Sequence, residues 1–215
     1  AFAALPPGWW LLPAAGVLLL AASQLAVALT NWAAGLLATP RMLPRMDYSF
    51  GIPPASRTLV VVPTLLGSER DIDDLVEQLE VRFLANRDAQ LYFGLLTDFH
   101  DAAQERCTDD DALLRLAREK IEALNRKYSE PASAAHDGDR FFLFHRPRRW
   151  NPREGVWMGH ERKRGKLADL NALLRGRAGA GPGERFSAIV GDTVPLRAVR
   201  YVITLDTDTQ LPRDS

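Results

Sequence analysis

Residues 201–212 of this chain read YVITLDTDTQLP. An apolar, β-branched run at residues 201–205 leads directly into two carboxylates, Asp206 and Asp208, which are one residue apart. A short apolar run of this kind is typical of a β-strand. The stretch therefore predicts a strand that ends in a pair of acidic side chains, and the rest of the chain must supply the sheet around it.

The sequence before this stretch alternates between strand and helix patterns. Three further apolar runs have the length and composition of strands: residues 58–62, 91–96 and 141–144. One amphipathic helix is predicted to begin after an N-cap at Ser68, a second to cover residues 109–128, and a short third to cover residues 166–174. This alternation predicts an α/β domain with a mainly parallel sheet over residues 57–215.

The first forty residues differ sharply in composition from the rest. Residues 1–40 contain no charged residue, whereas all 27 Lys and Arg and all 27 Asp and Glu follow them. The apolar stretch exceeds the roughly 20 residues that a helix needs to cross a bilayer, and Arg41 and Arg45 follow it as the positive-inside rule predicts. We expect a transmembrane segment at residues 1–40, with the charged domain in the cytoplasm. A soluble helical hairpin remains an alternative, whereas the lack of a basic n-region disfavours a signal peptide.

A proline-rich segment, RMLPRMDYSFGIPPAS, separates the two parts at residues 41–56. Three prolines in this length predict a juxtamembrane linker along the membrane surface, so the soluble domain is expected to begin near Arg57. The single cysteine, Cys107, excludes an intramolecular disulfide and a cysteine-based zinc cluster. This cysteine usage fits a cytosolic location for the charged part.

Polar residues are predicted at the carboxyl ends of three strands, where parallel sheets bind their ligands. They are Thr64, Asp98 and the pair Asp206 and Asp208. If strand geometry persists, Asp206 and Asp208 point the same way, and two like charges that close repel each other unless a cation intervenes. Mg²⁺ or Mn²⁺ is typically bound by one or two carboxylates together with phosphate oxygens. The pattern therefore favours a divalent metal and a diphosphate ligand.

Residues 146–166, RPRRWNPREGVWMGHERKRGK, predict a long basic loop with interleaved tryptophans. Such a loop could bind single-stranded nucleic acid, anionic lipid or a sugar diphosphate, or it could be a solvated face. Lys166 is expected in the first turn of the helix that follows, where free N–H groups favour an anion. The four histidines show no metal-ligand spacing, and none is assigned a catalytic role.

These motifs resemble a known family. The loop of residues 146–166 with the LADLN that follows, TLVVVPTLL, LLTDF and YVITLDTDTQLPRD are similar to the glycosyltransferase domain of cyclic β-1,2-glucan synthases. The resemblance covers essentially the whole chain. It implies a GT-A, Rossmann-like nucleotide-diphosphosugar transferase fold with a mostly parallel sheet, incomplete at the C-terminus. It also implies inverting transfer of glucose from UDP-glucose into β-1,2-linked glucan.

The resemblance assigns roles residue by residue. Asp208 would hold the Mg²⁺ or Mn²⁺ that bridges the diphosphate, and Asp206 would contact the ribose or the metal through water. Asp98 would meet the uridine, and Thr64 would line the nucleotide pocket through its backbone. A further pair of positions matches the G-K-x-x-x-L-N element that precedes D-x-D in related transferases, namely Lys166 and Asn171.

The resemblance further implies an N-terminal fragment of a larger enzyme, with residues 57–215 forming the nucleotide-sugar-binding half of its transferase domain. No general base is identified, and one is expected beyond Ser215, so the fragment alone should be inactive. The implied partners are the UDP-glucose donor, a growing glucan acceptor and the lipid bilayer, without nucleic acid. The implied location is a bacterial-type inner membrane, with the domain facing the cytoplasm.

Two other functions stay open at this point. The run VITLDTDT also fits the D-x-D-x-T motif of haloacid-dehalogenase-type phosphatases, where Asp206 would be the nucleophile and Asp208 the general acid/base on a Mg²⁺ site. That motif normally follows the first strand of its domain, whereas in this chain a series of predicted strands and helices comes before it. The third possibility is a non-catalytic, membrane-anchored module whose basic loop binds lipid or glycan.

Overall fold

The structure is a computed structural model, and it describes residues 8, 10–38, 48–129, 138–177, 179 and 183–209. The chain divides into two compact units, Ala1–Asp47 and Tyr48–Ser215.

The first unit contains one uninterrupted helix, α1, at Leu11–Leu37. Its 27 residues correspond to about 40 Å of helix, more than the roughly 30 Å hydrocarbon core of a bilayer. Its mean hydropathy reaches 2.0 and none of its residues is buried, so by length and composition it could span a membrane. Because the helix runs without a break, the alternative of a helical hairpin is wrong.

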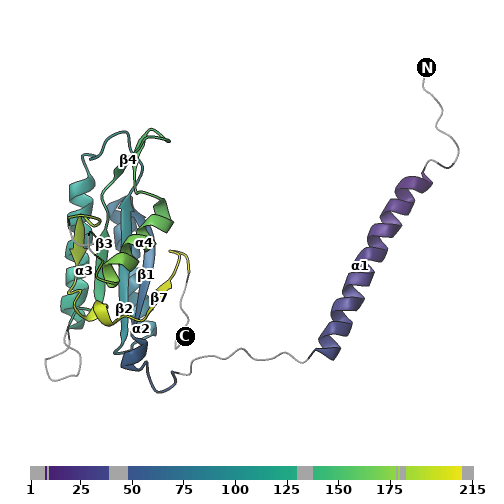
Figure 1. The fold of residues 1–215 in the computed structure, drawn as a ribbon, viewed down its shortest axis with the longest axis horizontal. Helices are drawn as coiled ribbons and strands as arrows, with labels where there is room; N and C mark the ends of the chain where they lie inside the picture. Colours follow the sequence, from purple (N-terminus) through teal and green to yellow (C-terminus); the bar gives the residue numbers. More distant parts are fainter. Residues whose placement is uncertain are drawn as a thin grey trace. The chain divides into compact units, whose positions relative to one another are not determined.

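The second unit is built on a five-stranded sheet with the strand order β6-β3-β2-β1-β7 (Figure 1). The strands are β1 Thr58–Leu66, β2 Leu91–Phe99, β3 Phe141–His145, β6 Ala188–Val190 and β7 Tyr201–Thr204. Strands β3, β2, β1 and β7 are parallel, and β6 pairs antiparallel with β3. The predicted α/β class with a mostly parallel sheet is therefore confirmed.

Helices cover both faces of this sheet. On one face, α2 (Glu69–Ala85) and α3 (Asp110–Tyr128) bury apolar side chains against Val60 and Val62 of β1. On the other, α4 (Arg162–Leu174) buries Leu170 against Leu59 and Val61. Alternate residues of β1 thus serve two separate cores, as expected for a strand that is buried on both faces.

Strand β1 lies where the strand order reverses. The chain proceeds from β1 outward to β2 and β3, and then returns to place β7 on the opposite side of β1. The carbonyl of Val61 accepts a hydrogen bond from the N–H of Leu205. The backbone N–H and C=O groups of odd-numbered residues of β1 therefore point toward β7. The backbone nitrogen of Pro63 lies on this same side and has no hydrogen to donate. Pairing between β1 and β7 has already ended at Val61. The reversal of strand order between β1 and β7 is a topological switch point of the kind beyond which open α/β sheets bind ligands.

The compact unit begins at Tyr48, ahead of the expected start near Arg57. Ile52 packs against the core of α2 and α3, and its N–H donates to Asp88 Oδ2 over 2.8 Å. A short 3₁₀ helix, η1 (Pro54–Ser56), then leads into β1. The predicted N-cap is confirmed, since Ser68 accepts a hydrogen bond from the backbone N–H of Asp71.

The segment expected to be a long loop contains further structure. Strands β4 (Arg149–Asn151) and β5 (Val156–Met158) form an antiparallel hairpin in which Trp150 pairs with Trp157. A second 3₁₀ helix, η2 (Pro195–Ala198), precedes β7. Three-residue strands carry too little periodicity to be recognised from sequence.

Candidate functional site

The two aspartates of the D-x-D motif lie on a turn, which we call the D-x-D turn (residues 206–209). Strand β7 ends at Thr204, and the N–H of Thr209 donates to the carbonyl of Asp206 over 3.1 Å. The premise that strand geometry persists through Asp208 is therefore wrong. The ladder between β1 and β7 ends at Val61, and Pro63, the next residue of β1 on that side, has no N–H that could continue it.

The two carboxylates of the turn have different environments. Asp206 pairs with Lys163 of α4, and its side chain is 63% exposed. Asp208 is exposed, and its carboxylate makes no hydrogen bond or ion pair within the described residues. No cluster of three or more potential metal ligands occurs in the described part of the chain. Two carboxylates nevertheless suffice for Mg²⁺ or Mn²⁺ when phosphate oxygens complete the coordination.

Arg82, in the last turn of α2, donates hydrogen bonds to the backbone of the D-x-D turn. Its Nη2 donates to the carbonyls of Thr207 and Thr209 over 3.0 and 2.8 Å, and its Nε donates to Thr209 over 3.3 Å. The side chain is only 5% exposed. The turn is therefore fixed through its backbone, while the Asp208 carboxylate has no hydrogen bond or ion pair among the described residues.

A second acidic group, Asp98, is buried near the end of β2. Arg146 binds it through two hydrogen bonds, from Nε to Oδ1 over 2.8 Å and from Nη2 to Oδ2 over 2.9 Å. Lys166 adds an ion pair of 3.1 Å, and the three side chains are 2–4% exposed. Gly159 packs so closely that a Cβ there would lie 2.2 Å from Oδ2 of Asp98. Asp98, Arg146 and Lys166 form what we call the buried ion cluster.

Lys166 lies in the second turn of α4, because the helix begins at Arg162. The expectation that Lys166 sits among the free N–H groups of a first helical turn is therefore wrong. Its Nζ donates to the backbone carbonyl of Thr64 over 2.7 Å and pairs with Asp98. Burial lowers the pKa of this ammonium group, and the charge of Asp98 partly opposes that shift. Three predicted positions, Thr64, Asp98 and Lys166, thus come together.

Asn171 does not join this group. It is exposed on α4, and its Oδ1 accepts a hydrogen bond from Arg175 Nε over 3.0 Å. No contact within the described residues links it to the buried ion cluster or to the D-x-D turn. Its role in nucleotide binding stays a prediction.

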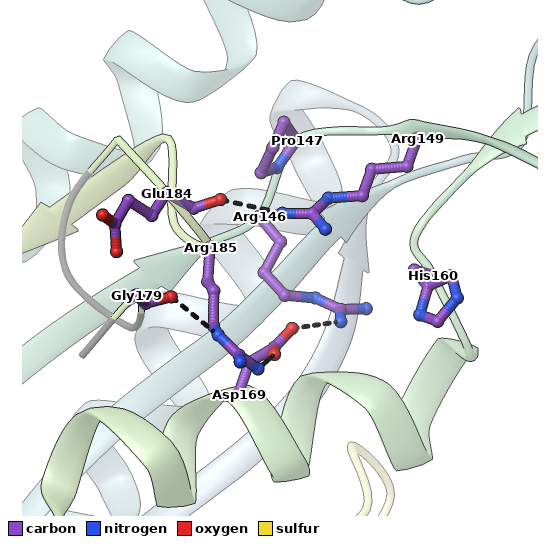
Figure 2. Close-up of a pocket in the computed structure, with 8 residues that line it drawn as sticks. All are labelled: Arg146, Pro147, Arg149, His160, Asp169, Gly179, Glu184 and Arg185. Atoms are coloured by element: carbon purple, nitrogen blue, oxygen red, sulfur yellow. Dashed lines mark hydrogen bonds and ion pairs between the residues drawn. The ribbon is translucent and has the colours of Figure 1, made fainter. Parts of the chain in front are cut away.

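A basic pocket of about 330 Å³ lies beside the buried ion cluster (Figure 2). Its lining residues are Arg146, Pro147, Arg149, His160, Asp169, Gly179, Glu184 and Arg185. Asp169 lies between two guanidinium groups, 2.8 Å from Arg146 Nη1 and 2.6 Å from Arg185 Nη1 (Figure 2). Burial favours a higher pKa for this carboxyl, but the hydrogen bonds from Arg146 and Arg185 outweigh it, so the pKa lies below its ordinary value.

Helix α4 connects all of these features. Three of its side chains, spaced three residues apart, make these contacts. Lys163 pairs with Asp206 of the D-x-D turn, Lys166 binds Thr64 of β1 and Asp98 of β2, and Asp169 pairs with Arg146. Gly165 allows the tight start of the helix, because a Cβ there would lie 2.0 Å from the carbonyl oxygen of His160. The helix therefore fixes the relative positions of the exposed and buried acids.

The histidines have no catalytic arrangement in the described part of the chain. His145 is fully buried with its Nδ1 2.8 Å from Thr97 Oγ1, and burial is the main cause that lowers its pKa to about 4. It is therefore neutral at physiological pH and acts in packing. His136 lies outside the described residues.

Comparison with known proteins supports the resemblance seen in the motifs. The chain is 44% identical over 197 residues, or 91% of its length, to the cyclic beta-(1,2)-glucan synthase NdvB of Rhizobium meliloti (strain 1021). It spans 6% of the length of that protein. No family model matches the chain. The predicted similarity to a segment of a cyclic β-1,2-glucan synthase is thus confirmed.

Proposed function

We propose that this chain forms the donor-binding part of a membrane-bound, GT-A-type glycosyltransferase that uses UDP-glucose to build cyclic β-1,2-glucan with inversion. The similarity to a glucan synthase gives the reaction class. The observation that carries the proposal is the D-x-D turn, which follows β7 at the reversal of strand order and leaves the Asp208 carboxylate unpaired among the described residues. Nucleotides bind at such switch points in open α/β sheets.

The acidic pair fits a divalent metal. Asp208 would hold Mg²⁺ or Mn²⁺ directly, and Asp206 would contribute either to the metal or to the ribose. Once bound, the metal would supply positive charge where negative charge develops on the departing UDP. Lys163 neutralises Asp206 in its absence, which limits the repulsion between the two carboxylates.

The buried ion cluster is proposed to shape the nucleotide side of the site. Lys166 binds the Thr64 carbonyl and the Asp98 carboxylate at once, and so fixes the ends of β1 and β2 together. Both oxygens of Asp98 already accept hydrogen bonds from Arg146. If Asp98 binds the uridine, its carboxylate would therefore accept a hydrogen bond through a lone pair that Arg146 leaves unused. Asn171 stays a proposed contributor to donor binding.

Helix α1 is proposed to anchor the domain in a bacterial-type inner membrane, with residues 48–215 on the cytoplasmic side. Its length and hydropathy support this role, and Arg41 and Arg45 follow the apolar stretch as cytoplasmic flanks commonly do. A cytoplasmic location would give the donor site access to nucleotide sugar. The growing glucan is the proposed acceptor.

Titration calorimetry of UDP-glucose into the detergent-solubilised chain tests the proposal. We expect binding that requires Mn²⁺ and that is lost in Asp208→Asn, because the amide removes the charge that attracts the metal. The matched control is Asp73→Asn, which changes another exposed carboxylate, on α2, that pairs with Lys120. Absence of Mn²⁺-dependent binding by folded wild-type protein would overturn the proposal.

The same preparations separate the other two functions. Mn²⁺- or Mg²⁺-dependent hydrolysis of p-nitrophenyl phosphate, abolished by Asp206→Asn, would instead indicate the phosphatase. Binding to anionic vesicles that survives Asp208→Asn, with no nucleotide binding, would indicate the anchored module.

A further inference from the structure

Arg82 is a buried cation that contacts the D-x-D turn directly, and no sequence motif points to it. Its guanidinium makes three hydrogen bonds to the turn, all to backbone carbonyls, at Thr207 and Thr209. These two carbonyls flank Asp208 in the chain. The Arg82 side chain therefore holds the backbone on both sides of Asp208, whose carboxylate is unpaired among the described residues.

The chemistry of Arg82 differs from that of the other buried arginines. Arg146 and Arg148 each bind a buried carboxylate, at Asp98 and Asp110 respectively. Arg82 makes no ion pair within the described residues, and its Nη1 is buried there without a hydrogen-bond partner. Burial lowers the pKa of this guanidinium, as expected for a charge removed from water without a close counter-ion. A buried charge costs free energy, and among the described residues the hydrogen bonds to the turn are what compensates that of Arg82.

We propose that Arg82 is a positioning residue that preorganises the D-x-D turn for the metal and the donor diphosphate. This inference rests on the proposed function. The guanidinium is a planar fork, and it can hold two carbonyls in a fixed relation that a lysine ammonium cannot reproduce. Helices from the two faces of the sheet thus restrain the turn in different ways. Arg82 of α2 fixes its backbone, and Lys163 of α4 engages the Asp206 side chain.

Two variants test the role of the fork. Arg82→Met keeps much of the buried apolar stem and removes every hydrogen bond, whereas Arg82→Lys keeps the charge and loses the fork. The matched control is Arg140→Met, which removes an arginine that donates to a backbone carbonyl, that of Ala89, at the amino ends of β2 and β3. Stability measured by thermal unfolding registers any general damage in all three variants.

Two readouts are specific to the turn. Hydrogen exchange of the amides of Leu205 and Thr209, which donate to Val61 and Asp206, should accelerate at least tenfold in both Arg82 variants and stay unchanged in Arg140→Met. Binding of Mn²⁺ in the presence of UDP, followed by electron paramagnetic resonance, should weaken by about 10–100-fold in both Arg82 variants, the usual effect of removing a group that orients a metal ligand.

The outcomes separate the two proposals. If wild-type protein binds no Mn²⁺ with UDP, the proposed function fails, while faster exchange of the turn amides would still show that Arg82 orders the turn. If wild-type protein binds Mn²⁺ and both Arg82 variants bind it equally well, the positioning role is overturned. Binding restored by Arg82→Lys would also overturn it, because charge alone would then suffice. Should Arg82→Met fail to fold, Arg82→Lys carries the test.

Discussion

The buried ion cluster and the D-x-D turn carry acidic groups in opposite environments, although α4 contacts both. The Asp98 side chain is 2% exposed and binds two cations, whereas that of Asp206 is 63% exposed and binds one. Asp208 makes no contact through its carboxylate in the described part of the chain. In the cluster, hydrogen bonds from Arg146 fix the side chain of Asp98, whereas in the turn hydrogen bonds from Arg82 fix the backbone.

This difference indicates a division of labour. A buried carboxylate that compensates two buried cations cannot be released without leaving those charges unpaired. An exposed carboxylate on a restrained turn can change partners at little cost. We infer that the cluster is a scaffold for the nucleotide side of the site, where Asp98 would meet the uridine without releasing its cations, and that the turn is the ligand-binding element for the metal. Variants of the cluster should therefore act mainly on stability, and variants of the turn mainly on metal binding.

The largest effect is expected for Asp98→Asn. This change leaves Arg146 and Lys166 buried without their shared counter-ion, so the free energy of unfolding should fall by about 3–5 kcal/mol. Urea unfolding followed by circular dichroism measures the change, with Asp73→Asn as the exposed control. A loss no larger than that of the control would show that the cluster is not a scaffold and would remove the contrast with the turn.

A smaller effect, spread over pH, is expected from His145 beside the cluster. Burial, together with Lys166 and Arg148, lowers its pKa to about 4, and Asp98 and Asp110 oppose that shift. The unfolded chain binds the proton near pH 6.5, so the contribution of neutral His145 is complete above pH 6.5 and is lost as the pH falls toward 4. The full loss amounts to at most about 3 kcal/mol.

The substitution His145→Asn isolates this contribution, because the amide can replace Nδ1 toward Thr97 but does not titrate. Urea unfolding at pH 7, 6, 5 and 4.5 should show a shallower loss of stability in the variant than in wild type. The exposed His100 supplies a control in His100→Asn, which should retain the wild-type slope. Equal slopes for wild type and His145→Asn would show that the site is hydrated and titrates normally.

Much of the fold could be predicted from the sequence because its main strands and helices carry strong local patterns. The runs that became β1, β2, β3 and β7 are short, apolar and flanked by breakers, and the α2 cap at Ser68 is a local motif. Strand β1 nevertheless continues past Val62 through Pro63, because the missing N–H is on the side of β7 and leaves the pairing with β2 intact. That tolerance depends on the neighbouring strand and is invisible in the local sequence.

The candidate site was predictable to the extent that strand ends mark it. The rule placed Thr64 and Asp98 at one edge, and the structure brings them together through Lys166. The contacts of Arg82, and the pairing of Arg146 from the basic loop with Asp98, were not predicted. Their partners lie far along the chain, 125 and 127 residues from Arg82 and 48 residues from Arg146. Such pairings follow from the packing of helices against the sheet and leave no periodic signal.

The smallest effect is expected at the exposed contact between the two regions, in Lys163→Met. Lys163 and Asp206 are about half or more exposed, and such pairs contribute little to stability, so the melting temperature should stay at the wild-type value. Mn²⁺ must displace Lys163 to reach Asp206. Without nucleotide, the variant should therefore bind Mn²⁺ about two- to fivefold more tightly at low salt, a gain within the range of a surface ion pair.

Screening by salt distinguishes this competition from a direct role of Lys163 in binding. The Debye length falls to about 3 Å at 1 M salt, so the affinities of wild type and Lys163→Met should converge there. Arg164→Met is the control, since the neighbouring Arg164 pairs with Glu161 and makes no described contact with the D-x-D turn. Weaker Mn²⁺ binding by Lys163→Met at low salt would show that Lys163 holds Asp206 in its binding position. The side chains of the turn would then be fixed as firmly as those of the cluster, and the distinction between scaffold and ligand-binding element would fail.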